Sequence, residues 1–155
     1  MDKLPIQAGT YALILELSAA QILQVGRFGG LNFPAGNYVY LGSARGPGGI
    51  RARLGRHIHG GAKTRWHIDY LRARALVVEY GFREQSNWRL ADEIPLECQW
   101  SQEIAKLPGA TTPVVKFGAS DCKAGCQAHL VFFETQRWAS ARQFFPLRLI
   151  HHFIG

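Results

Sequence analysis

YALILEL, residues 11–17, is an apolar segment with a single charged side chain, Glu16. Residues that favour β-strands dominate it, and it is short for a helix, so we expect a strand here. Gln21–Gly26 is predicted to pair with it as a hairpin, and Asn37–Leu41 to form a third strand, because glycines and a proline between these segments indicate turns. Three successive strands with short connections predict an antiparallel meander.

A helix is predicted after the glycine-rich turn at residues 46–49. Apolar residues recur every four positions from Ile50 to Ile58, which aligns them on one helical face. Arg53 and His57 follow the same spacing one position earlier, so we expect them along the edge of the buried face. Gly60 is well suited to end this helix.

Two more helices and two more strands are predicted further along the chain. The helices are expected at residues 65–73 and 95–107, and the strands at Leu76–Phe82 and Leu130–Phe133. Alternate residues of the first of these strands, beginning with Leu76, are expected on one side of the sheet. Residues 138–155 show no clear pattern. The expected fold class is α+β, a small antiparallel sheet with a three-stranded core and added strands, flanked by helices.

Length and composition bound the kind of protein. The chain has 155 residues, of which 47% are hydrophobic and 19% charged, and we expect one globular domain over residues 1–155. We see neither an apolar run as long as a membrane span nor a secretory signal, so we expect no membrane association. Three cysteines, an odd number, argue against a disulfide framework. A reducing compartment, and hence the cytoplasm, is the expected location.

The positive charge is concentrated in one segment. The formal net charge is +7, and residues 45–74 contain eight Lys or Arg residues against one acidic residue, Asp69. Elsewhere, ten basic residues are balanced by ten acidic ones. Such a cluster is typical of a surface that binds a polyanion, although a solvated basic helix face explains the charge equally well.

Three short motifs follow one another in the first part of the chain. They are Gly9-Thr10-Tyr11, Tyr40-Leu41-Gly42, and Arg-Leu-Gly-Arg-His at residues 53–57. In this order they resemble the GIY-YIG nuclease superfamily, and most closely its small stand-alone Uri-like branch, the domain of unknown function 123 type. The segments at 33–36, 66–71 and 117–122 resemble that branch too. The resemblance implies a GIY-YIG-like domain with a motif core at about 9–107 and a C-terminal extension at about 108–155.

The resemblance also implies a catalytic site. Tyr11 and Tyr40 would be its two phenols, and Arg53 would hold the scissile phosphate, which suits the planar fork of a guanidinium. His57 matches a histidine used by some members. Glu97 matches the single carboxylate that binds a divalent metal, Mg²⁺ or Mn²⁺. From the residues alone, the tyrosines are equally well explained as packing in strands, and Arg53 as a surface arginine.

Substrate binding is expected from glycine, hydroxyl and basic residues near these motifs. The expected set is Gly42, Ser43, Arg45, Arg51, Arg56 and His67. A phenol has an unperturbed pKa of about 10, so a tyrosine base would need nearby positive charge, which the basic segment could supply. The general base is open among Tyr11, Tyr40 and His57, with Tyr40 favoured.

The function that follows is a metal-dependent endonuclease. We expect it to hydrolyse phosphodiester bonds in DNA, which is preferred over RNA as the substrate. The alternative is a nucleic-acid-binding module of the same fold with little or no cleavage activity. The sequence does not indicate the substrate structure or the oligomeric state.

The cysteines pose a separate question. Cys122, Cys126 and His129 have the spacing C-x3-C-x2-H, and Cys98 would complete four ligands if its helix lay close to them. A structural zinc site is one interpretation. The favoured interpretation is three buried, inert thiols and a hydrogen-bonded histidine, because free cysteines are readily buried.

Overall fold

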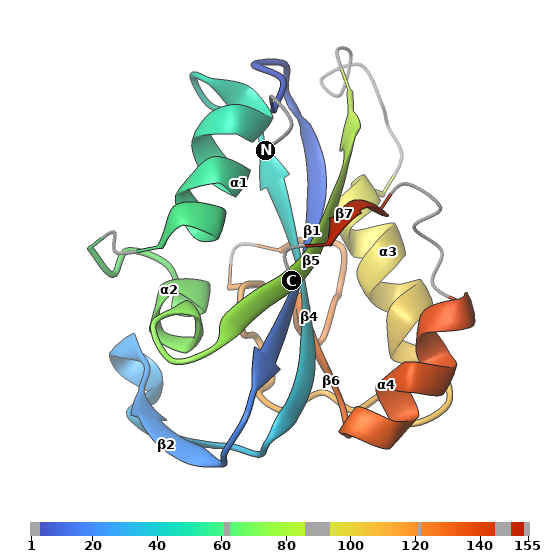
Figure 1. Cartoon of the computed structure of the whole chain (residues 1–155). Helices are drawn as coiled ribbons and strands as arrows, with labels where there is room; N and C mark the ends of the chain where they lie inside the picture. The colour runs from blue at the N-terminus through green and yellow to red at the C-terminus, as the bar shows by residue number, and fades with distance from the viewer. Residues whose placement is uncertain (1–3, 61–62, 86–93, 121, 145–149, 154–155) are drawn as a thin grey trace.

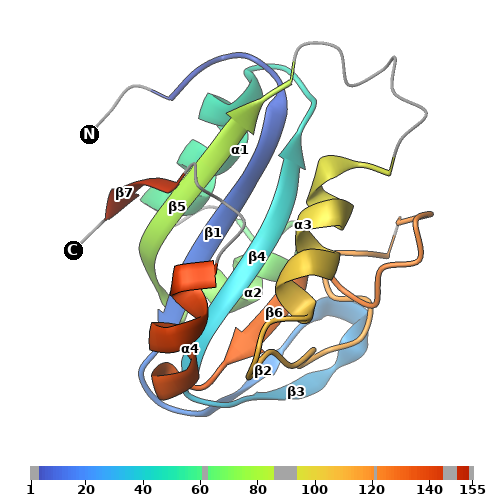
Figure 2. The same ribbon diagram turned by 90° about the vertical axis from the view of Figure 1, so that its right-hand side faces the viewer.

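The structure is a computed structural model that describes residues 4–60, 63–85, 94–120, 122–144 and 150–153. A five-stranded antiparallel sheet in the order β6-β4-β1-β5-β7 forms its centre. Helices α1 and α2 cover one face of the sheet, and α3 and α4 cover the other (Figures 1 and 2). The predicted α+β class is therefore confirmed.

The strands and helices have these bounds. The sheet contains β1 (Gly9–Leu17), β4 (Gly36–Ala44), β5 (Leu76–Glu84), β6 (Leu130–Phe133) and β7 (Ile150–Phe153), and a separate hairpin contains β2 (Gln21–Gln24) and β3 (Gly30–Phe33). The helices are α1 (Gly49–His59), α2 (His67–Arg72), α3 (Leu96–Ala105) and α4 (Thr135–Ala141). None of the helices in the described part of the chain is long and apolar enough to cross a bilayer.

The central strand β1 supplies side chains to two hydrophobic cores. Leu13 and Leu15 pack in the core beneath α1 and α2, whereas Ala12 and Ile14 pack in the core beneath α3 and α4. This alternation follows from the two-residue period of a strand. Because both faces are covered, β1 is apolar at nearly every position, which explains why YALILEL is not a simple alternating pattern.

The predicted meander is wrong. β2 does not pair with β1; it pairs with β3 in the small hairpin, and β1 pairs instead with β4 and β5. The register aligns Leu17 with Gly36, so the hairpin is an insertion between two neighbouring strands of the sheet. The physical reason is burial: β4 offers nine residues of which eight are buried, whereas β2 has four residues and only Leu23 is buried.

The predicted sidedness of β5 is also wrong. Its pairing with β1 contains a register shift at Ile14 and Leu15, typical of a β-bulge. In a regular strand, Val77 and Tyr80 would face opposite sides of the sheet. Because of the shift, both pack in the core beneath α1 and α2, and Leu76 is 71% exposed. An irregularity of this kind changes which residues face the core without changing the composition of the strand.

The other predicted elements lie close to where we expect them. Helix α1 ends at Gly60, whose φ of 69° favours glycine, and Pro95 precedes the first turn of α3. Helix α2 is shorter than the predicted 65–73. The tail that showed no pattern contains the second half of α4, which begins at Thr135, and β7.

Candidate active site

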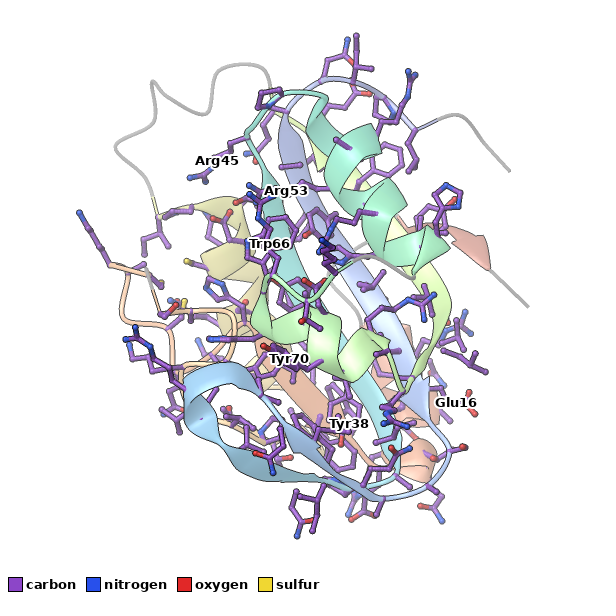
Figure 3. All side chains as sticks on the ribbon, turned by 90° about the vertical axis from the view of Figure 1, so that its left-hand side faces the viewer. Glu16, Tyr38, Arg45, Arg53, Trp66 and Tyr70 are labelled. Carbon is purple, nitrogen blue, oxygen red and sulfur yellow. The ribbon has the colours of Figure 1, made fainter. Side chains whose placement is uncertain are left out.

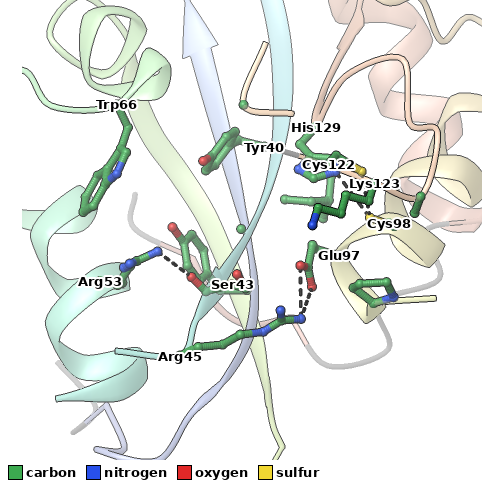
Figure 4. A pocket seen from close by; sticks show the side chains of 16 residues that line it. Tyr40, Ser43, Arg45, Arg53, Trp66, Glu97, Cys98, Cys122, Lys123 and His129 are labelled. Carbon is green, nitrogen blue, oxygen red and sulfur yellow. Dashed lines mark hydrogen bonds and ion pairs between the residues drawn. The ribbon is translucent and has the colours of Figure 1, made fainter. Parts of the chain in front are cut away.

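A cavity of about 430 Å³ lies at the edge of β4, between α1 and α3 (Figure 4). Strand β6 pairs with β4 over Asn37–Tyr40, and among the described residues no strand pairs with the edge at 42–44. The cavity occupies the space beside this uncovered edge. Several predicted residues line it together: Tyr11, Tyr40, Gly42, Ser43, Arg45, Arg53 and Glu97.

The two tyrosines come from neighbouring strands and lie close together. Tyr11 is on β1 and Tyr40 is on β4, and their ring centroids are 6.3 Å apart. The Tyr11 hydroxyl lies 3.0 Å from Nε2 of His57, a residue that α1 brings against the sheet. His57 is therefore behind Tyr11 and buried, not at the edge of the helix face as the spacing predicts.

Burial governs the acid–base properties of these three groups. It raises the pKa of Tyr40 to about 12 and the pKa of Tyr11 well above its ordinary value, although the Arg53 guanidinium acts in the opposite direction. It lowers the pKa of His57 to about 4. The positive charge of Arg53 does favour a phenolate, as expected of the basic segment, but burial outweighs it, so these pKa shifts leave both phenols protonated and the imidazole neutral at neutral pH.

An ion pair lies on the other side of His57. Arg56 on α1 donates to both carboxylate oxygens of Asp69 on α2, at 2.6 and 2.9 Å. Asp69 also accepts the backbone N–H groups of Arg65 and Trp66. Burial alone would raise the pKa of this carboxyl, but these hydrogen bonds outweigh it and lower the pKa. The negative carboxylate lies 3.8 Å from Nδ1 of His57, which has no hydrogen-bond partner.

Arg53 is held in a defined position at the cavity wall. It donates to the backbone oxygen of Ser43, at the uncovered edge of β4, over 3.0 Å. Its guanidinium carbon lies 4.8 Å from the ring centroid of Trp66, which Arg56 also contacts at 4.5 Å. Figure 3 shows Arg45, Arg53 and Trp66 following one another on the side of the molecule that α1 and α2 cover.

Glu97 lies across the cavity from Arg53. It is in the first turn of α3, where the helix dipole favours a carboxylate, and is 93% buried. One guanidinium nitrogen of Arg45 lies 3.2 and 3.4 Å from its two oxygens (Figure 4). Mg²⁺ and Mn²⁺ are bound by one or two carboxylates together with water and substrate oxygens, so Glu97 fits a metal site that the substrate completes.

Three residues predicted to bind substrate have other contacts. Arg51 donates to the backbone oxygen of Leu4, and Arg56 is occupied by Asp69. Nδ1 of His67 accepts the backbone N–H of Gly118, and its ring packs against aromatic side chains. None of the three lines the cavity beside β4. Their contacts hold the N-terminal segment, α2 and the loop after α3 in place.

The packing of the Tyr11 ring explains why residue 42 is a glycine. It pairs with Tyr11 across β1 and β4, and a Cβ atom at this position would lie 2.5 Å from Cζ of the Tyr11 ring. The missing side chain thus makes room for the phenol. This packing explains the glycine without a contact to the substrate, which is the role predicted for Gly42.

Three charged or aromatic side chains at or near the cavity were not predicted as site residues. Trp66 and Lys123 line the cavity, and Asp69 holds Arg56 beside His57. The sequence does distinguish Asp69, because it is the one acidic residue in the basic segment at residues 45–74. Lys123 lies in a loop without periodicity, and nothing in the sequence indicates that it lies near Glu97.

The structure brings the three cysteines and His129 together. Their ligand atoms, three Sγ and one imidazole nitrogen, all lie within 4.8 Å of one another, and this group can hold a metal ion. Helix α3 does bring Cys98 close to the other three. The favoured interpretation of inert thiols does not anticipate this convergence.

The cavity suits an anionic ligand. Arg45, Arg53 and Lys123 surround one carboxylate, Glu97, and Trp66 adds an aromatic surface. A wall with excess positive charge and an aromatic ring is suited to phosphate groups and to stacked bases.

Comparison with known proteins places the chain in one family. Neither the curated proteins nor the solved structures contain a match. The family described as "Domain of unknown function DUF123" matches residues 10–146, which include both tyrosines, Arg53, Glu97 and the cysteines. The chain therefore belongs to the DUF123 family.

Proposed function

We propose that this protein is a metal-dependent endonuclease of the GIY-YIG type, hydrolysing phosphodiester bonds in DNA or RNA. One observation supports this proposal above the others. Tyr11, Tyr40, Arg53 and Glu97 come from β1, β4, α1 and α3, yet all four line a single cavity. If they had only structural roles, nothing would require a phenol pair, a guanidinium and a carboxylate from four elements to meet.

Arg53 is the expected phosphate ligand. Its bond to Ser43 uses one nitrogen, and the stacking on Trp66 limits rotation of the guanidinium. The remaining donors can therefore bind phosphate oxygens with little further loss of side-chain freedom. Arg45 and Lys123 extend the positive surface past the cleavage point, where the neighbouring phosphates of a polynucleotide would lie.

Glu97 is the expected metal ligand. The metal, when bound, stabilises the negative charge on the leaving oxygen. Arg45 neutralises Glu97 in the free protein, which makes burial of the carboxylate tolerable. A substrate phosphate competes with Glu97 for the Arg45 guanidinium. Once the phosphate has bound Arg45, the Glu97 carboxylate is available to the metal.

We expect His57 to be the final acceptor of the proton that the attacking water loses, which passes to it by way of Tyr11. As water attacks the phosphorus, it gives a proton to the Tyr11 oxygen, and Tyr11 gives its own proton to Nε2 of His57. The resulting imidazolium is stabilised by the Asp69 carboxylate near Nδ1. Tyr40, the base favoured from the sequence, becomes a hydrogen-bond donor to the phosphate, because a pKa of about 12 leaves it protonated at neutral pH.

The test is cleavage of supercoiled plasmid and of a branched DNA duplex with Mg²⁺ or Mn²⁺. We expect metal-dependent nicking that falls by about 10²–10³-fold in Arg53→Ala and in Glu97→Gln, as for other residues that stabilise transition-state charge. The matched controls are Arg137→Ala on α4 and Glu103→Gln at an exposed position of α3, which remove the same charges outside the cavity.

Absence of cleavage would overturn the nuclease proposal. If the purified protein cuts neither substrate with either metal, yet binds DNA and loses binding in Arg53→Ala but not in Glu97→Gln, the protein is a nucleic-acid-binding module. Nicking that survives unchanged in both variants would indicate a contaminating nuclease.

A further inference from the structure

The strongest unexplained feature is the cluster of Cys98, Cys122, Cys126 and His129. The proposed hydrolysis uses none of these four residues. Cys98 lies on α3, the next two lie in the loop that follows this helix, and His129 immediately precedes β6. They are thus contributed by the helix, by the loop after it and by the residue that precedes β6.

The spacing of their ligand atoms is that of a metal site. Sγ of Cys98 lies 3.5 Å from Sγ of Cys122 and 3.5 Å from Nε2 of His129. Tetrahedral zinc with usual bond lengths separates two sulfurs by about 3.8 Å and a sulfur from a nitrogen by about 3.5 Å. These two distances therefore need little adjustment, and the other ligand atoms, all within 4.8 Å of one another, need to move closer by about 1 Å at most. A disulfide between the first two would leave Cys126 and His129 unexplained and requires sulfurs about 2.0 Å apart.

The surroundings favour a closed, structural site. Cys98, Cys126 and His129 are buried, and Cys122 is partly buried at the rim of the cavity. All four coordination positions of a tetrahedral ion would be filled by the protein, which leaves none for a substrate. Three thiolates and one imidazole select zinc over Mg²⁺ or Mn²⁺, which prefer oxygen.

We propose that these four residues bind one Zn²⁺ ion as a Cys3His site that fastens the loop after α3 to the helix and to β6. Cys98 is adjacent to Glu97, and Cys122 is adjacent to Lys123, so both cavity residues are neighbours of zinc ligands in the chain. Figure 4 shows the two cysteines and His129 beside Glu97 on one wall. The ion would hold that wall in place. This site is separate from the Glu97 metal site and does not depend on the nuclease proposal.

The first test measures metal in the unmodified protein. After expression without a histidine tag and removal of loosely bound metal, elemental analysis should find one zinc ion per chain. Titrating the thiols with an organomercurial in the presence of a zinc indicator should release that ion as the three cysteines react. Zinc below about a tenth of an equivalent, both as purified and after incubation with Zn²⁺, overturns the proposal, as does iron with inorganic sulfide.

The second test identifies the ligands. Protein loaded with Co²⁺ should show the absorption bands of a tetrahedral, thiolate-bound ion, and Cys126→Ser should lose them together with the zinc. Ser120→Ala, an exposed change in the same loop, should keep both. Glu97→Gln should also retain its zinc, even if no nuclease activity is ever found. An octahedral spectrum of the unmodified protein loaded with Co²⁺ contradicts the assignment and requires no variant. Zinc that is retained in Cys126→Ser contradicts it as well.

Discussion

His57 is the residue whose surroundings bear most directly on the proposed chemistry. One ring nitrogen faces the Tyr11 hydroxyl, and the other faces the Asp69 carboxylate, which Arg56 holds in place. The carboxylate is the nearest anion to Nδ1, so the tautomer with a proton on Nδ1 is favoured and Nε2 is left to accept a hydrogen bond from Tyr11. A buried neutral imidazole in this tautomer is ready to take a proton.

The same burial makes folding sensitive to acid. The pKa of His57 is about 4 in the folded protein and about 6.5 when unfolded, so between these values the unfolded chain binds more protons. The free energy of unfolding should therefore fall as the pH decreases from 6.5 to 4, by about 3 kcal/mol from this group. Urea unfolding monitored by circular dichroism at several pH values measures it.

The matched variants are His57→Gln and His59→Gln, both on α1. His57→Gln should flatten this part of the pH profile, whereas His59→Gln, at an exposed position, should leave it unchanged. Equal slopes in the two variants would mean that folding does not lower the pKa of His57.

The order of the motifs, through the family that they resemble, predicts the cavity residues that carry the proposed chemistry. Tyr11, Tyr40, Arg53 and Glu97 are all predicted by this resemblance, and all four line the cavity. The position of His57 behind Tyr11 is not predicted, because the burial of a helix edge depends on which strand lies beneath it. The part played by Trp66 depends on its stacking with two arginines, which is a contact in space and not a sequence pattern.

At the scale of elements, the close approach of β1 and β4 creates the phenol pair. Gly42 is opposite Tyr11, so a methyl group there would force the ring away from its present position. Gly42→Ala should reduce the free energy of unfolding by about 1–3 kcal/mol, as overpacking usually does. Chemical denaturation measures the loss, and the proposed cleavage activity should fall with it.

A double-mutant cycle separates this contact from a general effect of alanine. In a Tyr11→Leu background the Gly42→Ala change should have a smaller effect, because the shorter side chain does not reach the new methyl group. Gly55→Ala on α1, where a Cβ would meet only an ordinary contact at 3.8 Å, should not destabilise the protein. Additive effects of the two changes would show that Gly42 is needed for another reason.

The positions of the elements were more predictable than their pairing. β1, β4, α1 and α3 follow from local composition and period, which act over a few residues. The pairing of Leu17 with Gly36 across an inserted hairpin depends on which long apolar strand is available, and the bulge in β5 depends on its fit to β1. The convergence of Cys98 with residues 122–129 is likewise set by the path of a loop.

At the scale of the whole molecule, charge is distributed unevenly. The basic segment forms α1 and α2 on one side of the sheet, and Arg53 and Arg45 bring this charge to the cavity. If the proposed function is right, binding to a DNA duplex should weaken as salt increases, because bound counterions are released. The plot of log affinity against log salt concentration gives the number of phosphates contacted.

Arg53→Ala should lower the slope of that plot by about one phosphate equivalent, as well as the affinity. Fluorescence anisotropy without added metal, in the Glu97→Gln background where cleavage is expected to be about 10²–10³-fold slower, measures both. Arg137→Ala should leave the slope unchanged, because it removes a charge from α4. A slope that is equal in all variants would mean that the cavity does not contact the backbone of the DNA.

The order of strands in the sheet has a consequence for the newly made chain. β1 leaves the ribosome before its two neighbours in the sheet, β4 and β5, which come later in the sequence. Until β4 has emerged, this nine-residue apolar strand has two unpaired edges, and until β5 has emerged it has one; such edges promote aggregation. Productive synthesis of this protein therefore depends on keeping β1 apart from other nascent chains until β5 has emerged.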